Sequence, residues 1–240
     1  GHVTGLTPPA YNLPDDKYHS FREEAWNWYI RTINALKPID VLIINGDAID
    51  GRQEKSGGAE LITGNRNKQV DMATECIKMV NAPHIYMTYG TPYHVGQLES
   101  FEDNIAEKVG ATIYNNLMLD INGCIIDARH KISRSNIPHG RFTALARTSM
   151  WNDLINESGT KANVIGRSHV HYFSMVAHSN NRICFTSPAL QGYTNYGARE
   201  CEGQVDYGVT SFNVTDAGIV EDFKMYKAVF ESNINPIVKL

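Results

Sequence analysis

Apolar side chains recur every three or four positions between residues 20 and 36, which is the spacing of an amphipathic helix. Ser20, with Glu23 three positions later, predicts a capping box at the start of this helix, and Pro38 predicts its end. Residues 1–14 contain several prolines and glycines and indicate a loop. The pattern therefore predicts a loop followed by an amphipathic helix.

The next part of the chain alternates between strands and helices. Residues 39–45 are almost wholly apolar and end at Gly46-Asp47, which predicts a buried parallel strand with a polar residue at its carboxyl end. Further helices are expected at about 67–81 and 98–109, and further strands at about 84–89 and 112–114. This alternation predicts an α/β sheet with helices packed on it.

Beyond residue 115 the pattern is mostly that of strands. Asn122-Gly123 separates two short apolar runs and is a strong signal for a two-residue hairpin turn. Later elements are expected as a helix at about 141–156, a strand that ends at Gly166, a hairpin through Asn180-Asn181 and a final pair of strands around residues 216–218. Because no linker divides the chain, we expect one domain over residues 1–240, with two sheets packed together and helices outside.

Composition excludes several classes of protein. The net charge is −4 and 42% of residues are hydrophobic, which is ordinary for a globular protein and gives no overall signal for nucleic acid. No run approaches the roughly 18 apolar residues that a membrane helix needs. The four cysteines form no CxxC pair, which favours a reducing compartment. We therefore expect a cytoplasmic protein that does not bind membranes.

Candidate chemistry lies where the expected strands end, which is where open α/β sheets place their ligands. Asp47 follows the first strand, G-T-P-Y-H follows the second at residues 90–94, and His130 follows the hairpin. His169 and His171 follow a later strand, and in an extended segment residues two apart project to one side. Carboxylate and imidazole together suit Mn, Fe, Zn or Ni. Two such ions can clamp a phosphoryl group and generate a hydroxide nucleophile.

In their order these features resemble the calcineurin-like metallophosphoesterase family, which is defined by D-x-H, G-D, G-N-H-[DE], a later H and G-H-x-H. The resemblance implies a four-layer α/β fold, in which two mixed β-sheets are flanked by helices, and a site for two divalent metal ions. It implies that Asp47 bridges both metals and that His171 binds the first. It also implies that His130 and His169 bind the second metal, with the Thr91 hydroxyl in place of the usual amide ligand.

Three departures from the family pattern matter, and one of them is the insertion of two residues, Arg167 and Ser168, between Gly166 and His169. No D-x-H precedes Asp47, so we expect this motif and a central strand in a segment that precedes Gly1 of a longer protein. Residues 1–9 resemble the segment directly after that motif in phage and prophage members of the family. His94 lies two positions later than the usual general-acid histidine. It is a candidate general acid, and a metal ligand or a loop histidine without a role are the alternatives.

Two arginines are candidates for binding substrate. Arg167 lies between Gly166 and the two histidines, where it could hold a phosphate oxygen or be a solvated charge at the end of a strand. Arg129 precedes His130 and belongs to a local basic cluster, whose other members are Lys131, Arg134, His139, Arg141 and Arg147. The cluster is either a solvated face or a surface that follows phosphates, which would suit a nucleic-acid or nucleotide substrate.

The sequence thus favours a metal-dependent phosphoesterase, with a phosphodiesterase or nuclease preferred over a monoesterase. The alternative is a degenerate member of the family that keeps one metal or none and serves as an interaction module. A third interpretation treats the histidines as ordinary residues without metal.

Overall fold

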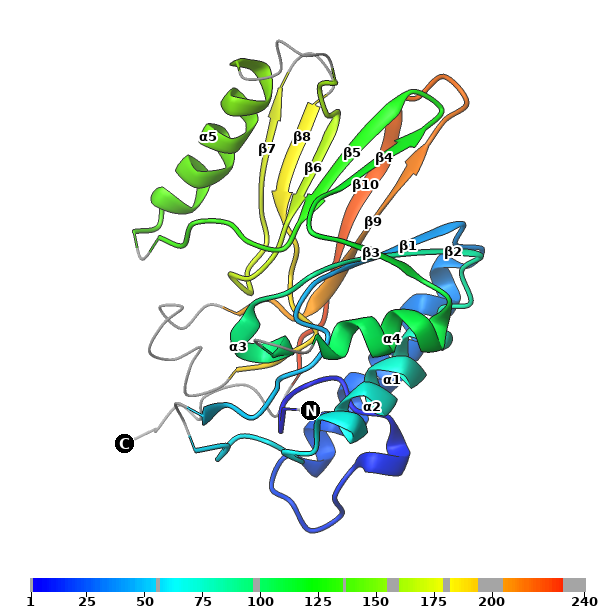
Figure 1. The fold of residues 1–240 in the computed structure, drawn as a ribbon, viewed down its shortest axis with the longest axis vertical. Coiled ribbons are helices and arrows are strands. Elements are labelled where there is room, and N and C mark those ends of the chain that lie inside the picture. Colours follow the sequence, from blue (N-terminus) through cyan, green and yellow to red (C-terminus); the bar gives the residue numbers. More distant parts are fainter. Residues whose placement is uncertain are drawn as a thin grey trace, which may run out of the picture.

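The computed structural model describes residues 2–54, 57–96, 100–135, 137–154, 160–178, 182–193 and 205–230 (Figure 1). The helices are η1 (Pro9–Tyr11), α1 (His19–Leu36), α2 (Arg66–Lys78), α3 (Pro92–Val95), α4 (Phe101–Val109) and α5 (Gly140–Leu154). The strands are β1 (Val41–Asn45), β2 (His84–Thr88), β3 (Thr112–Tyr114), β4 (Leu117–Ile121), β5 (Cys124–Arg129), β6 (Val164–Arg167), β7 (Ser174–His178), β8 (Arg182–Thr186), β9 (Gly208–Val214) and β10 (Val220–Lys227).

The first sheet contains three parallel strands in the order β1-β2-β3. Val70 of α2 and Ile105 of α4 pack with Met87 of β2 in one buried cluster. Tyr29 and Ile33 of α1 form a neighbouring cluster on the same side of the molecule. In Figure 1 these three helices lie together below the sheet and make up the first layer of the fold.

The second sheet contains five strands in the order β4-β5-β6-β8-β7 and is mixed, with β5, β6 and β8 parallel to one another. Alternate residues of its strands face opposite sides. Ile126 and Val164 share a core cluster with Ile43 of β1 and therefore face the first sheet. Ile165 lies on the other face, where it packs with Leu145 of α5. The layers are thus helix, sheet, sheet, helix.

The predicted fold class is confirmed: packed β-sheets lie between helices. Only the five-stranded sheet is mixed, because the three-stranded sheet is parallel and β9 and β10 form a separate antiparallel pair. The hairpin turn at Asn122-Gly123 is confirmed by positive φ at both residues and by pairing of Ile121 with Cys124. The turn expected at residues 180–181 lies outside the described residues, although the flanking strands β7 and β8 are antiparallel.

Two local expectations are wrong. Helix α1 begins at His19, so Ser20 lies inside the helix and no side chain caps its first residue. Instead, Asp16 accepts hydrogen bonds from the backbone of Tyr18 (2.7 Å) and His19 (2.9 Å). Strand β1, expected to be fully buried, is half-buried throughout, because it is an edge strand that pairs only with β2 among the described strands. None of the described helices is long and apolar enough to cross a membrane.

Candidate metal centre

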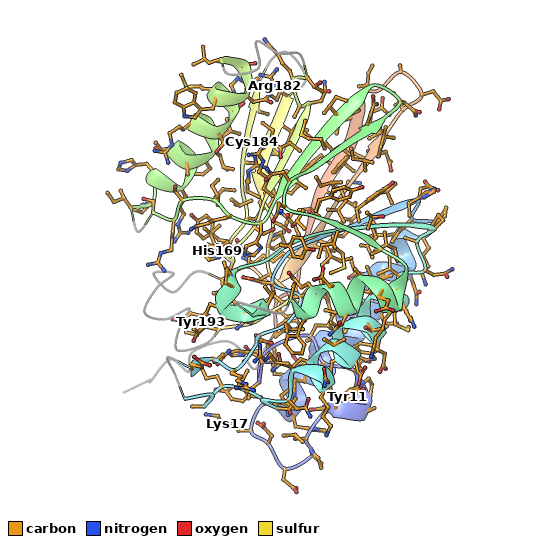
Figure 2. All side chains as sticks on the ribbon, viewed as in Figure 1. Tyr11, Lys17, His169, Arg182, Cys184 and Tyr193 are labelled. Atoms are coloured by element: carbon orange, nitrogen blue, oxygen red, sulfur yellow. The ribbon has the colours of Figure 1, made fainter. Side chains whose placement is uncertain are left out.

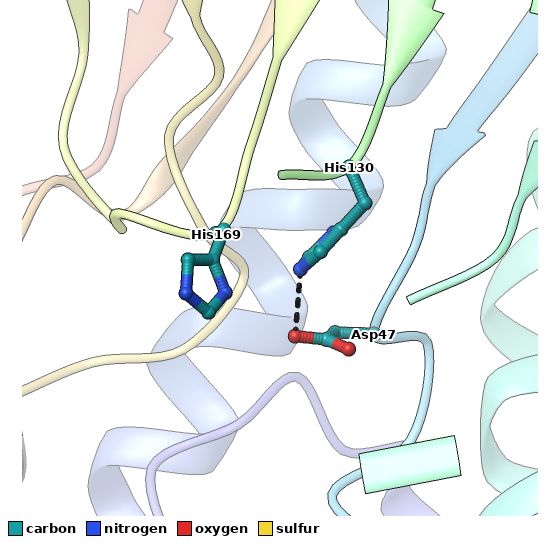
Figure 3. A group of neighbouring side chains, drawn as sticks. All are labelled: Asp47, His130 and His169. Atoms are coloured by element: carbon teal, nitrogen blue, oxygen red, sulfur yellow. Dashed lines mark ion pairs between the residues drawn. The ribbon is translucent and has the colours of Figure 1, made fainter. Parts of the chain in front are cut away.

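Three predicted ligands converge between the two sheets (Figure 3). Asp47 follows β1 of the first sheet, whereas His130 and His169 follow β5 and β6 of the second. One ligand atom from each residue lies within 4.8 Å of the others. Figure 2 shows His169 at the junction of the two halves of the molecule, below Cys184 and Arg182 on strand β8. The centre therefore forms only when the two sheets are packed together.

The backbone at this centre is unusual. Asp47, His169 and His171 have φ values of 53°, 74° and 58°, in a left-handed region that residues with a side chain seldom adopt. Such strained positions gather at functional sites. The expectation that His169 and His171 lie in an extended segment is therefore wrong. His169 joins Asp47 and His130, whereas His171 is not one of the three converging ligands.

The ring of His130 is held in the orientation that a metal ligand needs. Its Nδ1 lies 2.7 Å from the carbonyl oxygen of Asn45, which can only accept, so Nδ1 carries a hydrogen. Its buried Nε2 lies 2.8 Å from Oδ2 of Asp47 but has no partner in hydrogen-bond geometry among the described residues. A neutral Nε2 would point its lone pair at a carboxylate, so a cation or a proton is needed here. Metal-binding histidines show this arrangement.

The charges of Asp47 and His130 are strongly linked. Burial alone would raise the pKa of Asp47, but the imidazole of His130, in close contact and positively charged when protonated, outweighs it and lowers the pKa to about 2. Burial would lower the pKa of His130, but the carboxylate of Asp47 prevails and raises it. Burial, together with the charge of His130, lowers the pKa of His169. Burial also lowers the pKa of His171, to about 4. Both histidines therefore favour the neutral form that can bind a metal.

Thr91 and His94 both lie beside Asp47. The backbone nitrogen and the hydroxyl of Thr91 lie 2.6 Å and 3.1 Å from Oδ1 of Asp47, to which they donate hydrogen bonds. His94 is fixed through Nδ1, which lies 3.0 Å from the carbonyl oxygen of Asp50, and its Nε2 is 4.0 Å from Oδ2 of Asp47. The structure thus brings both residues to the centre, and their roles as ligand and general acid stay predictions.

Two glycines allow this close approach. Gly46 has a φ of 75°, and a Cβ atom there would lie 2.6 Å from Nδ1 of His130. A Cβ atom on Gly90 would lie 2.2 Å from both the backbone nitrogen and Oδ1 of Asp47. Because glycine has no side chain, the loops after β1, β2 and β5 can meet at Asp47, and any other residue at either position would clash.

Replacing Gly90 with alanine is expected to destabilise the protein by about 1–3 kcal/mol, because the clashing atoms of Asp47 include backbone that cannot rotate away. Urea unfolding measures the change. Gly64→Ala is the matched control, since Gly64 is exposed and has nothing within 4 Å of its added Cβ. Equal stability of the two variants would contradict the close approach of Gly90 and Asp47.

Asn45 was not predicted as part of the centre, yet it joins the strands that carry the ligands. Its side-chain nitrogen donates to Oγ of Ser168 (2.8 Å) and to the carbonyl oxygen of Arg129 (3.1 Å). Its side-chain oxygen accepts from the hydroxyl of Thr88 (2.7 Å). Asn45 therefore links the ends of β1, β2, β5 and β6. Only its position at the end of an apolar run could have suggested this role.

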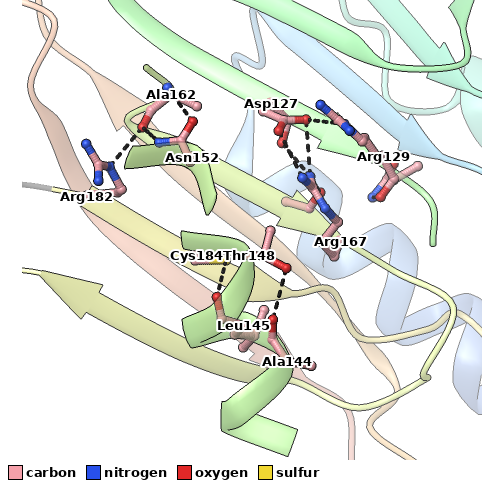
Figure 4. Close-up of polar contacts among 12 residues, drawn as sticks. Asp127, Arg129, Ala144, Leu145, Thr148, Asn152, Ala162, Arg167, Arg182 and Cys184 are labelled. Carbon is pink, nitrogen blue, oxygen red and sulfur yellow. Dashed lines mark hydrogen bonds and ion pairs between the residues drawn. The ribbon is translucent and has the colours of Figure 1, made fainter. Parts of the chain in front are cut away.

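Arg167 makes buried contacts of its own (Figure 4). It is 5% exposed, and Nη2 donates to Oδ2 of Asp127 at 2.9 Å. Nη1 donates to the carbonyl oxygens of Gly166 (2.8 Å) and Asp127 (3.1 Å). The structure thus gives Arg167 a structural contact, and its predicted contact with substrate stays a prediction. Arg129 also contacts Asp127, at 3.2 Å, but nearly half of its side chain (47%) is exposed.

Comparison with known proteins found backbone similarity only. No protein-family model matches the chain, and no curated protein matches it significantly. A single mutant of Vps29 from Entamoeba histolytica has 10% sequence identity and a TM-score of 0.44, over 85% of this chain and 89% of that one. An archaeal phosphodiesterase has 13% identity and a TM-score of 0.46, over 83% and 92%. Wild-type Vps29 from E. histolytica complexed with zinc has 11% identity and a TM-score of 0.40, over 78% and 98%.

Proposed function

We propose that this chain is a metal-dependent phosphoesterase whose metal centre is built on Asp47, His130 and His169. The observation that carries the proposal is the convergence of their ligand atoms within 4.8 Å of one another. The buried Nε2 of His130 supports it, because this atom lies 2.8 Å from Oδ2 of Asp47, and such a close approach needs a cation at the two atoms or a proton on the ring. One carboxylate with two imidazoles is a donor set for Mn, Fe, Zn or Ni rather than for Ca or Mg.

In this proposal the site would hold two divalent ions, and Asp47 would contribute to the binding of both. His130, His169 and the hydroxyl of Thr91 would hold one ion, and His171 would contribute to the other. When bound, such ions supply Lewis-acid polarisation of a phosphoryl oxygen and a water of lowered pKa. Asp47 is suited to this shared role because its pKa of about 2 keeps it ionised at neutral pH.

His94 is proposed to give a proton to the leaving-group oxygen. Its Nδ1 is anchored on the carbonyl oxygen of Asp50, which directs Nε2 toward the centre and fixes the side chain in one orientation. The imidazole is partly exposed, at 27%, so a substrate can reach it. A general acid must lie within hydrogen-bond reach of the atom that it protonates, and an anchored ring meets this requirement.

We propose a phosphodiester, in a nucleotide or nucleic acid, as the substrate class. Arg129 is adjacent to His130 along the chain, and nearly half of its side chain (47%) is exposed. Lys131, next along the chain, is also exposed. Cationic side chains at such a position favour a substrate with further phosphates, because arginine and lysine contact the phosphate backbone irrespective of sequence.

Purified protein with Mn²⁺ is expected to hydrolyse bis-p-nitrophenyl phosphate faster than p-nitrophenyl phosphate, and EDTA should abolish both reactions. Single-stranded DNA and a cyclic dinucleotide then separate nuclease from nucleotide phosphodiesterase activity. Absence of hydrolysis of every phosphate ester with Mn²⁺, Ni²⁺, Zn²⁺ and Fe²⁺ would contradict the proposal and favour an interaction module.

A further inference from the structure

Glu102 is a fully buried carboxylate close to the centre that the sequence did not single out. It lies in the first turn of α4 and is 0% exposed. An acidic residue in the first turn of a helix is common, because it is stabilised by the helix dipole, so its position alone carries no functional signal. Its buried side chain, however, points away from solvent and toward the loops that carry the metal ligands.

Each oxygen of Glu102 accepts a backbone hydrogen bond from a different loop. Oε1 accepts from the nitrogen of Ala48 at 2.9 Å, and Oε2 accepts from the nitrogen of Gly90 at 2.7 Å. Ala48 directly follows Asp47, and Gly90 directly precedes Thr91. One carboxylate therefore joins the loop after β1 to the loop after β2.

The two loops meet closely where Glu102 joins them. The backbone nitrogen of Thr91 donates to Oδ1 of Asp47 at 2.6 Å, a contact that depends on the separation of the loops. The same loop leads into α3, which carries His94. A shift of either loop would thus move the Asp47 carboxylate relative to both Thr91 and His94.

Burial of this carboxylate is unfavourable in itself. Burial raises the pKa of Glu102 to about 7, in opposition to the two backbone hydrogen bonds, which favour the ionised form. An apolar side chain would avoid the desolvation, but it would leave two backbone N–H groups without an acceptor. The position therefore requires a side chain with two acceptor atoms that point in different directions.

We infer that Glu102 is a positioning residue for the metal centre, which sets the distance between Asp47 and the loop that carries Thr91 and His94. This inference rests on the proposed function. Glu102 touches neither metal nor substrate in this role and acts through the backbone of Ala48 and Gly90. Partners of this kind, one step removed from the ligands, commonly fix metal affinity and activity.

Glu102→Gln tests the inference because it keeps the shape of the side chain and only one acceptor oxygen. Its amide NH₂ would face one of the two backbone N–H groups, and that loop should move. Calorimetric titration of the metal-free protein with Mn²⁺, well below the unfolding temperature, is expected to show affinity reduced by about 10- to 100-fold. A residue with only a structural role would lower the unfolding midpoint and leave the affinity of the folded protein unchanged.

Asp103→Asn is the matched control, because Asp103 lies in the same turn and loses the same charge but is exposed, and its carboxylate accepts a hydrogen bond from the hydroxyl of Tyr89 instead of joining the two loops. It should bind Mn²⁺ as the wild type does. If Glu102→Gln does not fold, Glu102→Asp replaces it, since the shorter side chain keeps both oxygens but cannot reach both loops. Reduced Mn²⁺ affinity is expected there too.

The outcomes separate this inference from the proposed function. A wild type that binds Mn²⁺ and hydrolyses a phosphodiester, with a folded Glu102 variant of equal affinity, would overturn the inference alone. A wild type that binds no Mn²⁺ would overturn both. Reduced affinity in the Glu102 variant but not in Asp103→Asn would establish the positioning role.

Discussion

Asp47→Asn is expected to lower the rate of Mn²⁺-dependent phosphodiester hydrolysis by well over about 100-fold. Loss of a residue that only supports a metal ligand can already cost that much, and Asp47 is proposed as a ligand itself. Asp47 is the only carboxylate among the three converging ligands, and its Oδ2 lies 2.8 Å from Nε2 of His130. The amide removes the negative charge and presents an NH₂ group or a weaker carbonyl donor instead. Initial rates with bis-p-nitrophenyl phosphate at saturating Mn²⁺ measure the effect.

Asp216→Asn is the control for this experiment. Asp216 is exposed in the turn between β9 and β10, so it has the same chemistry without a place at the centre. The activity of this variant should match that of the wild type. Circular dichroism shows whether Asp47→Asn is folded. A folded Asp47→Asn variant that retains more than a tenth of the wild-type rate would contradict the assignment of Asp47 as the shared ligand.

Asp127→Asn is expected to lower the free energy of unfolding by about 3–5 kcal/mol, because it leaves the buried charge of Arg167 without its counter-ion. Asp127 and Arg167 are 6% and 5% exposed, and their closest charged atoms are 2.9 Å apart (Figure 4). The asparagine keeps the shape of the side chain, so the loss is mainly electrostatic. Urea unfolding monitored by circular dichroism gives the change directly.

Arg129→Ala is the control, because it removes the exposed arginine from the same carboxylate. Exposed ion pairs contribute at most about 1 kcal/mol, so this variant should be nearly as stable as the wild type. Similar losses from Asp127→Asn and Arg129→Ala would contradict the view that burial makes the Arg167 contact the important one. Such a result would also make Arg167 a candidate again for binding a phosphate of the substrate.

The architecture could be predicted because each element carries its own local pattern. The apolar run at residues 39–45 and the Asn122-Gly123 turn are signals that neighbouring residues alone create. The predicted capping box at Ser20 is wrong, because the residue that caps the helix depends on how the preceding loop folds. Asp16 supplies the acceptors there, so the helix begins one residue earlier.

The convergence of the candidate metal ligands could be predicted where they follow strands whose ends meet. Asp47, His130 and His169 converge as their places at strand ends suggest. His171 is not among these three, and its role as a ligand stays a prediction, while the segment after β6 turns through left-handed conformations instead of remaining extended. Local sequence gives no sign of that turn, which depends on contacts with distant residues.

The residues that hold the centre in place could not be predicted. Asn45 bonds Ser168 and Arg129, and Glu102 bonds Ala48, all more than 50 residues away along the chain. Their roles exist only in the packed molecule. The partner of Arg167 was missed for the same reason, since Asp127 faces it across two neighbouring strands.

Anomalous scattering from crystals grown with Mn²⁺ tests the central claim most directly, because it locates the ion without reliance on activity. The account predicts an anomalous peak between Asp47 Oδ2, His130 Nε2 and the His169 ring, and loss of that peak in His169→Ala. Crystals with well-ordered side chains and no peak at these residues, or with a peak only elsewhere, would contradict it.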